Sequence, residues 1–154
     1  MNRKIKIRLL LLLILFSACR RNIKNESGNK TDNNELSQKK EQSMKMYINA
    51  EKVGVLWEDN ESVKALNGML PIEIEMKMYG DFEQVGSIGK KLPRNDVQMT
   101  TKSGDIVLYA GDQLVVFYGS NSWAYTKLGK IDLNEDKLKD LLGNGDVKIA
   151  LKNE

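Results

Sequence analysis

The stretch SGDIVLYAGDQLVVFYGSNSWAYTKLGKI, residues 103–131, decides the fold class that we expect for this chain. Two short apolar runs, residues 106–109 and 114–118, flank an Ala-Gly-Asp sequence, and this arrangement is typical of a β-hairpin. A third run, residues 125–131, predicts a further strand after a Gly-Ser-Asn-Ser turn. Short strands that follow one another through such turns indicate a mainly β domain.

The segments on either side of this stretch continue the β pattern. Residues 47–50 and 53–57 predict a second hairpin, with its turn near residues 51–52. In residues 72–78, Ile and Met alternate with Glu and Lys, which is the period of a strand with one buried face. Residues 147–151 predict the last strand of the chain.

The first of two expected helices begins near Asp59 or Asn60. Either side chain can accept hydrogen bonds from the free N–H groups of a first helical turn. Gly68 and then Pro71 are expected to end the helix, because both residue types disfavour its continuation. Its apolar side is formed by Val63, Leu66 and Leu70.

The second expected helix follows Asp132 or Asn134. Asp132 with Glu135 three residues later predicts a capping box, and Gly143 suits the left-handed position past the helix end. Many short strands with two small helices indicate a barrel or a sandwich closed at its ends. The apolar side of this helix is formed by Leu138, Leu141 and Leu142.

The N-terminal segment has the pattern of a lipoprotein export signal. Four basic residues within positions 3–8 precede an apolar run, residues 9–16, and Ser17 and Ala18 stand directly before Cys19. The run is too short to span a bilayer comfortably as a helix. We therefore expect residues 1–18 to be a lipoprotein signal peptide and Cys19 to carry the lipid. The alternatives are an ordinary secretory signal followed by a free thiol, and an uncleaved membrane anchor.

Composition separates a tether from one domain. Residues 19–44 contain the expected lipidated cysteine and a polar stretch with too few apolar side chains to fold, which predicts a disordered tether. Residues 45–154 are long enough for one compact domain. Residues 1–44 carry a net charge of +6 and residues 45–154 a net charge of −3, so no basic surface predicts nucleic-acid binding. The expected partner is a membrane, through the lipid, and the expected location is the bacterial cell membrane or envelope.

The residue types that the chain lacks exclude several kinds of site. It has no histidine, and its single cysteine lies at position 19. Residues 45–154 therefore supply neither a Ser-His-Asp triad nor a Cys-His pair, nor the ligands of most zinc, copper or haem sites. The densest acidic cluster, residues 132–140, lies where acids complement the dipole of the second helix. We expect no metal and no cofactor.

Several motifs resemble the bacterial cyclophilin-like domain family. They are residues 57–60, 103–109, 115–123, 125–131 and 142–147, which agree with the family in order and spacing. The resemblance covers about residues 45–152, nearly the whole domain. It implies a mainly β fold, a closed eight-stranded cyclophilin-like β-barrel with two short helices, one at each end.

The resemblance also implies an enzymatic alternative. Cyclophilins isomerise Xaa-Pro bonds with an arginine that hydrogen-bonds the prolyl amide, and Arg94 lies eleven residues before Asp105, a separation similar to theirs. Met99 stands where the cyclophilins have an aromatic residue and Lys102 where they have a glutamine, and the pocket histidine is absent. Of this catalytic signature only Arg94 is present, so Arg94 is the candidate catalytic residue. The alternative interpretation is that Arg94 is a loop arginine exposed to water.

Trp123 and Tyr125 lie in or beside the Gly-Ser-Asn-Ser turn. An exposed aromatic pair there forms a binding edge, whereas a buried pair caps one end of the barrel. With Arg94, these residues are the expected ligand-binding residues. We expect a non-catalytic binding module for a peptide or a small ligand. The alternatives are a weak peptidyl-prolyl cis-trans isomerase or envelope foldase, and a structural accessory of a larger envelope complex.

Overall fold

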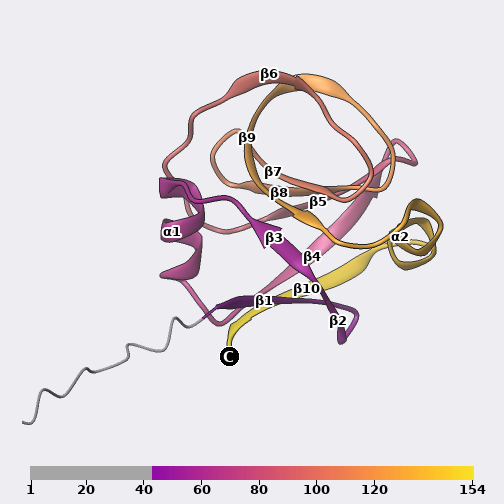
Figure 1. Ribbon diagram of the computed structural model, residues 1–154, viewed down its shortest axis with the longest axis horizontal. Coiled ribbons are helices and arrows are strands. Elements are labelled where there is room, and N and C mark those ends of the chain that lie inside the picture. The colour runs from indigo at the N-terminus through magenta and orange to yellow at the C-terminus, as the bar shows by residue number, and fades with distance from the viewer. Residues whose placement is uncertain (1–42) are drawn as a thin grey trace, which may run out of the picture. The chain divides into compact units, whose positions relative to one another are not determined.

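In a computed structural model of the protein, the described part of the chain is residues 43–154, which form ten strands and two helices (Figure 1). The expected signal peptide, Cys19 and nearly all of the expected tether lie outside these residues. Strand β1 begins at Met44, whose side chain is buried, so the folded part includes this residue. Within residues 43–154, no helix is long and apolar enough to cross a membrane.

The described strands belong to one sheet, in which all pairings are antiparallel. Its order is β2-β1-β10-β4-β5-β8-β7-β9-β3, and β6 pairs with β9 off this path. The two ends of the order, β2 and β3, are joined through Gly54, so the sheet nearly closes into a barrel. With β2 and β3 counted as one strand bent at Gly54, the path has eight strands, which confirms the expected barrel. The strands are β1 Met44–Ile48, β2 Glu51–Val53, β3 Val55–Trp57, β4 Ile72–Tyr79, β5 Glu83–Ser87, β6 Val97–Thr100, β7 Asp105–Tyr109, β8 Gln113–Phe117, β9 Ser122–Ile131 and β10 Val147–Asn153.

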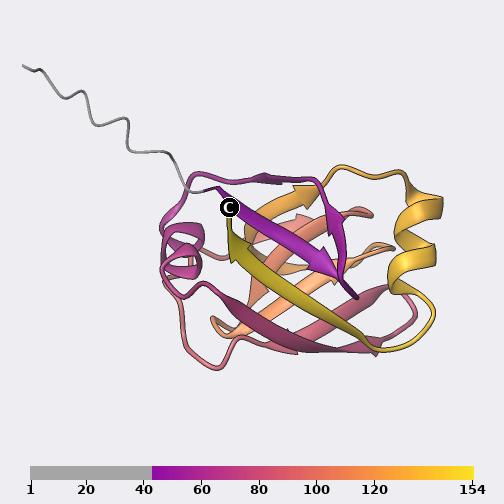
Figure 2. The ribbon, with the colours of Figure 1, turned by 90° about the horizontal axis from the view of Figure 1, so that it is seen from below.

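Helices α1 (Glu61–Asn67) and α2 (Glu135–Leu142) lie at opposite ends of the barrel (Figure 2). Asn60 caps α1, because its side-chain oxygen accepts a hydrogen bond of 2.9 Å from the N–H of Val63. The buried Leu66 side chain packs into the barrel core. Both helices therefore cover apolar side chains that the open ends of a barrel would expose to water.

Helix α2 follows Asn134, one of the two expected positions, but its capping interaction and the geometry at its end differ from the expectation. The prediction of a capping box of Asp132 and Glu135 is wrong. The side chain that accepts the capping hydrogen bond is that of Asn134, and the donor is the N–H of Lys137, at 2.9 Å. Gly143 has φ −96°, which is not left-handed. A glycine is still required there, because a Cβ would lie 2.8 Å from the carbonyl oxygen of Lys139. The chain adopts a positive φ only at the next glycine, Gly145, with φ 125°.

The hairpins and the alternating strand are confirmed. On β4, Ile74 and Met76 are buried and Glu73, Glu75 and Lys77 are exposed, as the period of two predicts, whereas Met78 near the end of the strand is exposed. The β1–β2 turn falls at Asn49 and Ala50, two residues before the expected position. Both have a positive φ, 48° and 72°, which is the geometry of a two-residue turn whose twist matches that of the strands.

Strands β5 and β6 are not among the strands expected from the sequence, because few of their residues are large and apolar. On β5, the fully buried Gln84 is polar, and its Nε2 donates to the carbonyl oxygens of Leu142 at 2.6 Å and Gly145 at 2.8 Å. Gly86 also faces the interior, where a Cβ would lie only 2.6 Å from Cγ2 of Ile74. The barrel is too narrow there for a side chain, so this strand carries no apolar alternation.

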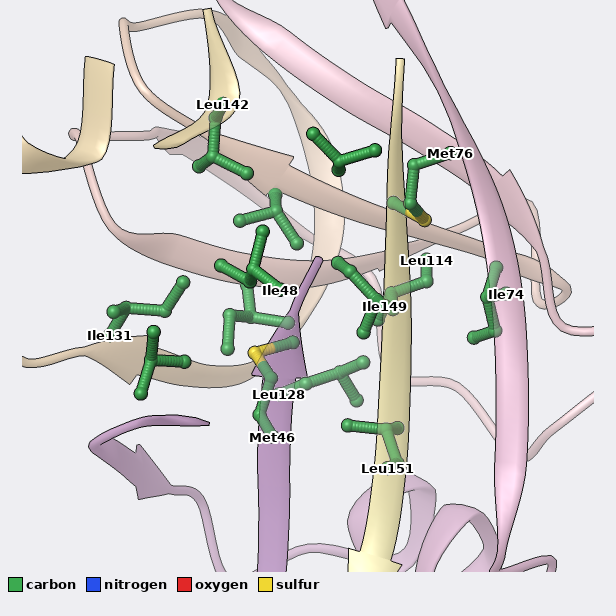
Figure 3. Close-up of a cluster of buried hydrophobic side chains, with 14 of the residues drawn as sticks. Met46, Ile48, Ile74, Met76, Leu114, Leu128, Ile131, Leu142, Ile149 and Leu151 are labelled. Atoms are coloured by element: carbon green, nitrogen blue, oxygen red, sulfur yellow. The ribbon is translucent and has the colours of Figure 1, made fainter. Parts of the chain in front are cut away.

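The main core fills the barrel, and a second, smaller cluster lies on the outer face of its sheet. In the barrel, side chains from β1, β4, β8, β9, β10 and α2 point toward one another (Figure 3). Each fully buried Leu, Ile or Met contributes about 1.5–3 kcal/mol. Side chains alternate between faces along a strand, so every second residue of β7 and β8 points outward. The second cluster is formed by Val107, Val115, Phe117 and Tyr125.

Candidate functional site

Strand β9 has two parts, and the first part covers the outer face of the sheet. Its later residues pair with β7 and β3 in the barrel wall, whereas residues 122–125 pair with β6. In Figure 1, β6 and the beginning of β9 lie together above β5, β7 and β8. Tyr125 therefore packs onto the outer cluster, and Trp123, two residues earlier, is 57% exposed beside it.

A pocket of about 340 Å³ lies on this outer face. Most of its lining surface is apolar, and four aromatic side chains contribute to it. Three of these aromatic residues are exposed, so their rings are accessible to a ligand. The pocket is lined by Tyr79, Glu83, Val85, Tyr109, Val115, Asn121, Trp123 and Tyr125.

The register of the strands explains why these side chains meet. Tyr79 of β4 lies opposite Glu83 of β5, which in turn lies opposite Phe117 of β8. In the neighbouring row, Val85 lies opposite Val115. Residues two apart on a strand share a face, so both rows present their side chains on the outer side of the sheet. The pocket is therefore built on paired strands, not on loops alone.

Glu83 is the one carboxylic acid in the lining of this pocket. Its side chain is only 7% exposed, and its Oε2 has no hydrogen-bond partner. Among residues 43–154, the carboxyl group also takes part in no ion pair. Burial raises the pKa of Glu83 above its ordinary value, because removal from water disfavours the charged form. Buried carboxyl groups are almost always paired, so this one is an exception that requires an explanation.

Tyr125 is held on several sides. Its ring packs edge-on against Phe117 and Tyr109, with centroids 5.7 Å and 6.0 Å away. Its hydroxyl oxygen accepts a hydrogen bond of 3.1 Å from Nδ2 of Asn121, whose Oδ1 accepts one of 2.8 Å from the N–H of Ser122. Burial raises the pKa of Tyr125, and the charge of the nearby carboxylate adds to the effect. The floor of the pocket is therefore rigidly packed.

Arg94 lies in a different pocket, of about 720 Å³ and more polar. Its Nη1 is 3.4 Å from a carboxylate oxygen of Asp96, and its side chain is half-exposed. Val97 and Met99 of β6 line the same pocket, and Tyr125 lines both pockets. The structure therefore brings Trp123 and Tyr125 together and leaves Arg94 on the far side of Tyr125.

Trp123 and Tyr125 line a pocket on the outer face instead of closing an end of the barrel. Neither side chain belongs to the interior cluster, and the helices occupy the two ends. Three further lining residues, Tyr79, Glu83 and Tyr109, are absent from the sequence-based candidates. The two tyrosines end strands that run into glycine-containing turns, which is a usable signal of rim positions. For Glu83 no such signal exists, because its burial depends on strand pairing.

The chemistry that the aromatic pocket offers is binding through ring faces and one carboxyl group. Its lining contains no lysine, arginine or cysteine. Within the described residues, no group of three or more His, Cys, Asp or Glu side chains could hold a metal ion. The expectation of no metal and no cofactor stays a prediction.

Comparison with known proteins gives one family. A family model described as the cyclophilin-like family matches residues 46–152. This range begins within β1 and ends one residue before the end of β10, so it includes all or most of every strand of the barrel and both helices. No curated protein matches the chain.

Proposed function

Because this chain belongs to the cyclophilin-like family, whose barrel frames an aromatic pocket here, we propose that its domain is a non-catalytic binding module for a peptide or a small ligand. One observation supports this proposal above the others. Tyr79, Tyr109 and Trp123 keep 68%, 41% and 57% of their surfaces exposed around a preformed hollow. Exposed large apolar side chains that gather at one place mark interaction sites.

The size and the rigidity of the pocket favour a small organic group. Its volume of about 340 Å³ lies near the lower end of the range of ligand pockets. Its floor is formed by Val85 and Val115 on paired strands and by the packed ring of Tyr125, so little ordering is required on binding. A peptide side chain or a comparably small molecule fits such a site.

Fluorine NMR of the full-length chain labelled with 5-fluorotryptophan tests the proposal. The chain has two tryptophans, and each gives its own resonance. Trp123 lines the pocket, whereas Trp57 donates from Nε1 to the carbonyl oxygen of Met44 at 2.9 Å and serves as the internal reference. A panel of peptides and small aromatic and aliphatic molecules should include compounds that shift the Trp123 resonance alone.

The matched variants are Trp123→Ala and Leu56→Ala. Leu56 is 70% exposed on β3 and does not line the pocket, so it controls for the loss of exposed apolar surface. Calorimetric titration of a compound found by NMR should show a lower affinity for Trp123→Ala and an unchanged affinity for Leu56→Ala. If no compound of the panel moves the Trp123 resonance, the binding-module proposal is wrong.

A weak peptidyl-prolyl isomerase activity is the second candidate. The observation that favours it is that Arg94 shares its pocket with Val97, Met99 and Tyr125, so one guanidinium borders apolar side chains. The barrier to rotation of a peptide bond is about 20 kcal/mol, and a few hydrogen-bond donors lower such barriers measurably. A proline-peptide isomerisation assay that shows no acceleration, or equal acceleration by the Arg94→Ala variant, removes this candidate.

The proposed location is a bacterial cell membrane or envelope, with a lipid on Cys19 as the anchor. The support is the sequence pattern around Cys19, since residues 1–18 and the cysteine lie outside the described residues. The Cys19→Ala substitution should move the protein from the membrane to the soluble fraction, which fractionation of cells that express the variant measures. Unchanged retention on the membrane contradicts lipid attachment at this residue.

A further inference from the structure

We propose that the aromatic pocket binds an organic cation of the methylated ammonium class, with the positive charge held between the ring faces and the Glu83 carboxylate. This inference rests on the proposed function, because it names the ligand class of the same pocket. Its basis is the coincidence of two features on one surface. One is a buried acid without a partner, and the other is a group of aromatic rings around it.

The first feature is an uncompensated charge. Only 7% of the surface of Glu83 is exposed, and its Oε2 has no hydrogen-bond partner. Its cross-strand neighbours are Tyr79 and Phe117, and no basic side chain lines the pocket. A buried carboxylate is unfavourable unless a positive charge or hydrogen-bond donors compensate it. A cationic ligand supplies the compensation that the protein does not.

The second feature is the aromatic wall. Ring faces carry partial negative charge, and a cation within about 6 Å of a ring centre is attracted to it, most strongly by tryptophan. Trp123 and Tyr79 stand exposed at the rim, while the rings of Tyr109 and Tyr125 meet at 66° with centroids 6.0 Å apart. A positively charged group in the pocket therefore meets several rings and one carboxylate.

The lining favours a methylated ammonium over a primary one. A primary ammonium has three N–H donors that require acceptors. The amide of Asn121 is engaged, since its Nδ2 donates to Tyr125 and its Oδ1 accepts from Ser122, so the acceptors offered to an ammonium are mainly those of the Glu83 carboxylate and the tyrosine hydroxyls. Val85 and Val115 present only methyl groups. A quaternary ammonium has no N–H groups, and its methyl groups pack against apolar walls. A hard metal cation is disfavoured because it requires six or more oxygen ligands.

The protonation state of Glu83 gives the inference a second readout. Burial raises the pKa of its carboxyl group. The titratable groups around it are Tyr79, Tyr109 and Tyr125 of the pocket lining, Tyr118 directly after the end of β8, and Asp81 in the β4–β5 turn. The charges of both Asp81 and Glu83 act on Tyr118. The cation binds the ionised carboxyl group, so its affinity should increase as the pH rises through the raised pKa of Glu83.

The test compares choline with its uncharged carbon analogue, 3,3-dimethylbutan-1-ol, on the full-length chain. The two molecules have the same shape and differ in charge. The fluorine resonance of Trp123 reports binding, and that of Trp57 is the reference. We expect choline to bind about tenfold more tightly than the alcohol, which is the effect of roughly one desolvated cation–ring contact.

Two isosteric variants make the comparison specific. Glu83→Gln should lower the affinity for choline because the carboxylate is lost, and the rings that remain should keep only part of the preference for choline over the alcohol. Asp81→Asn removes the same charge from an exposed residue outside the pocket lining, and it should preserve the preference for choline. Asn also tolerates the positive φ of 55° at this position, so the control variant should fold.

The outcomes separate this inference from the proposed function. Equal binding of the two probes, or a choline affinity that Glu83→Gln does not change, overturns the cation inference and leaves a binding pocket for neutral groups. No response of the Trp123 resonance to choline also overturns it. The proposed function fails only if the wider panel of peptides and small molecules leaves this resonance unchanged as well.

Discussion

Replacing Glu83 with glutamine should stabilise the protein in the absence of added ligand, and the gain should depend on pH. The carboxyl group is 7% exposed with a partnerless Oε2, and its pKa is raised by burial. A raised pKa means that the folded state binds this proton more tightly than the unfolded chain does. The proton on Glu83 therefore adds to the free energy of unfolding. This contribution is complete below the ordinary glutamate pKa and is lost as the pH rises through the raised pKa.

The size of the effect follows from the cost of the unpaired group. A buried polar or charged group without a partner costs about 1–3 kcal/mol, and a neutral amide of the same shape avoids the part that is due to the charge. At neutral pH, Glu83→Gln should therefore increase the free energy of unfolding by a part of this cost, about 1 kcal/mol. For a domain of this size, the melting temperature should rise by at least about 4 °C.

The assay is urea unfolding of the parent chain, Glu83→Gln and Asp81→Asn across a pH series from acid to neutral. The difference between the parent and Glu83→Gln should be small at acid pH, where the parent carboxyl group is also neutral, and should grow as the pH rises. Asp81→Asn, at an exposed position, should follow the parent throughout. A pH-independent difference, or a less stable Glu83→Gln at neutral pH, would refute the account of Glu83 as an uncompensated buried charge.

Two further predictions concern the frame of the pocket, and both are measured by urea unfolding. Gly86→Ala should lower the free energy of unfolding by about 1–3 kcal/mol, because its Cβ would lie 2.5 Å from the sulfur of Met76. Gly54→Ala is the control and should change the stability little, because its Cβ would have its nearest neighbour at 3.8 Å. Equal effects of the two substitutions would contradict the narrow interior. Asn134→Ala removes only the cap of α2 and should lower the free energy of unfolding by about 1 kcal/mol. Asn60→Ala should lower it by about 1–2 kcal/mol, because Asn60 caps α1 and also donates to a carbonyl oxygen of β9 at 2.9 Å. A smaller loss for Asn60→Ala than for Asn134→Ala would show that the bond to β9 contributes nothing.

The fold was largely predictable because most strands have a local signature. The alternation in residues 72–78 reflects one buried face, and the hairpin at residues 106–118 is marked by its turn. β5 escapes such reasoning, because Gln84 and Gly86 occupy interior positions for reasons that lie in other elements. Gln84 hydrogen-bonds the end of α2, and Gly86 gives room to β4.

The site was predictable only in part, for the same physical reason. Trp123 and Tyr125 stand out in the sequence as aromatic residues beside a turn, and the structure places both in one pocket. Tyr79 and Glu83 come from the opposite wall, and they meet Trp123 only because β4, β5, β8, β7 and β9 are neighbours in the sheet. Such long-range pairing is not encoded in any local pattern. Arg94, chosen by resemblance, borders a separate pocket.

The pairing of β1 with β10 has a practical consequence. Met44 lies opposite Asn153, so the described segment enters and leaves the barrel at neighbouring points. In the sheet order, β1 and β10 lie three to five strands away from β8 and β7, and Figure 1 shows these two pairs on opposite sides of the barrel. Attachment to a sensor chip through the C-terminal tail should therefore leave the mouth of the aromatic pocket pointing away from the support, open to whatever flows past it.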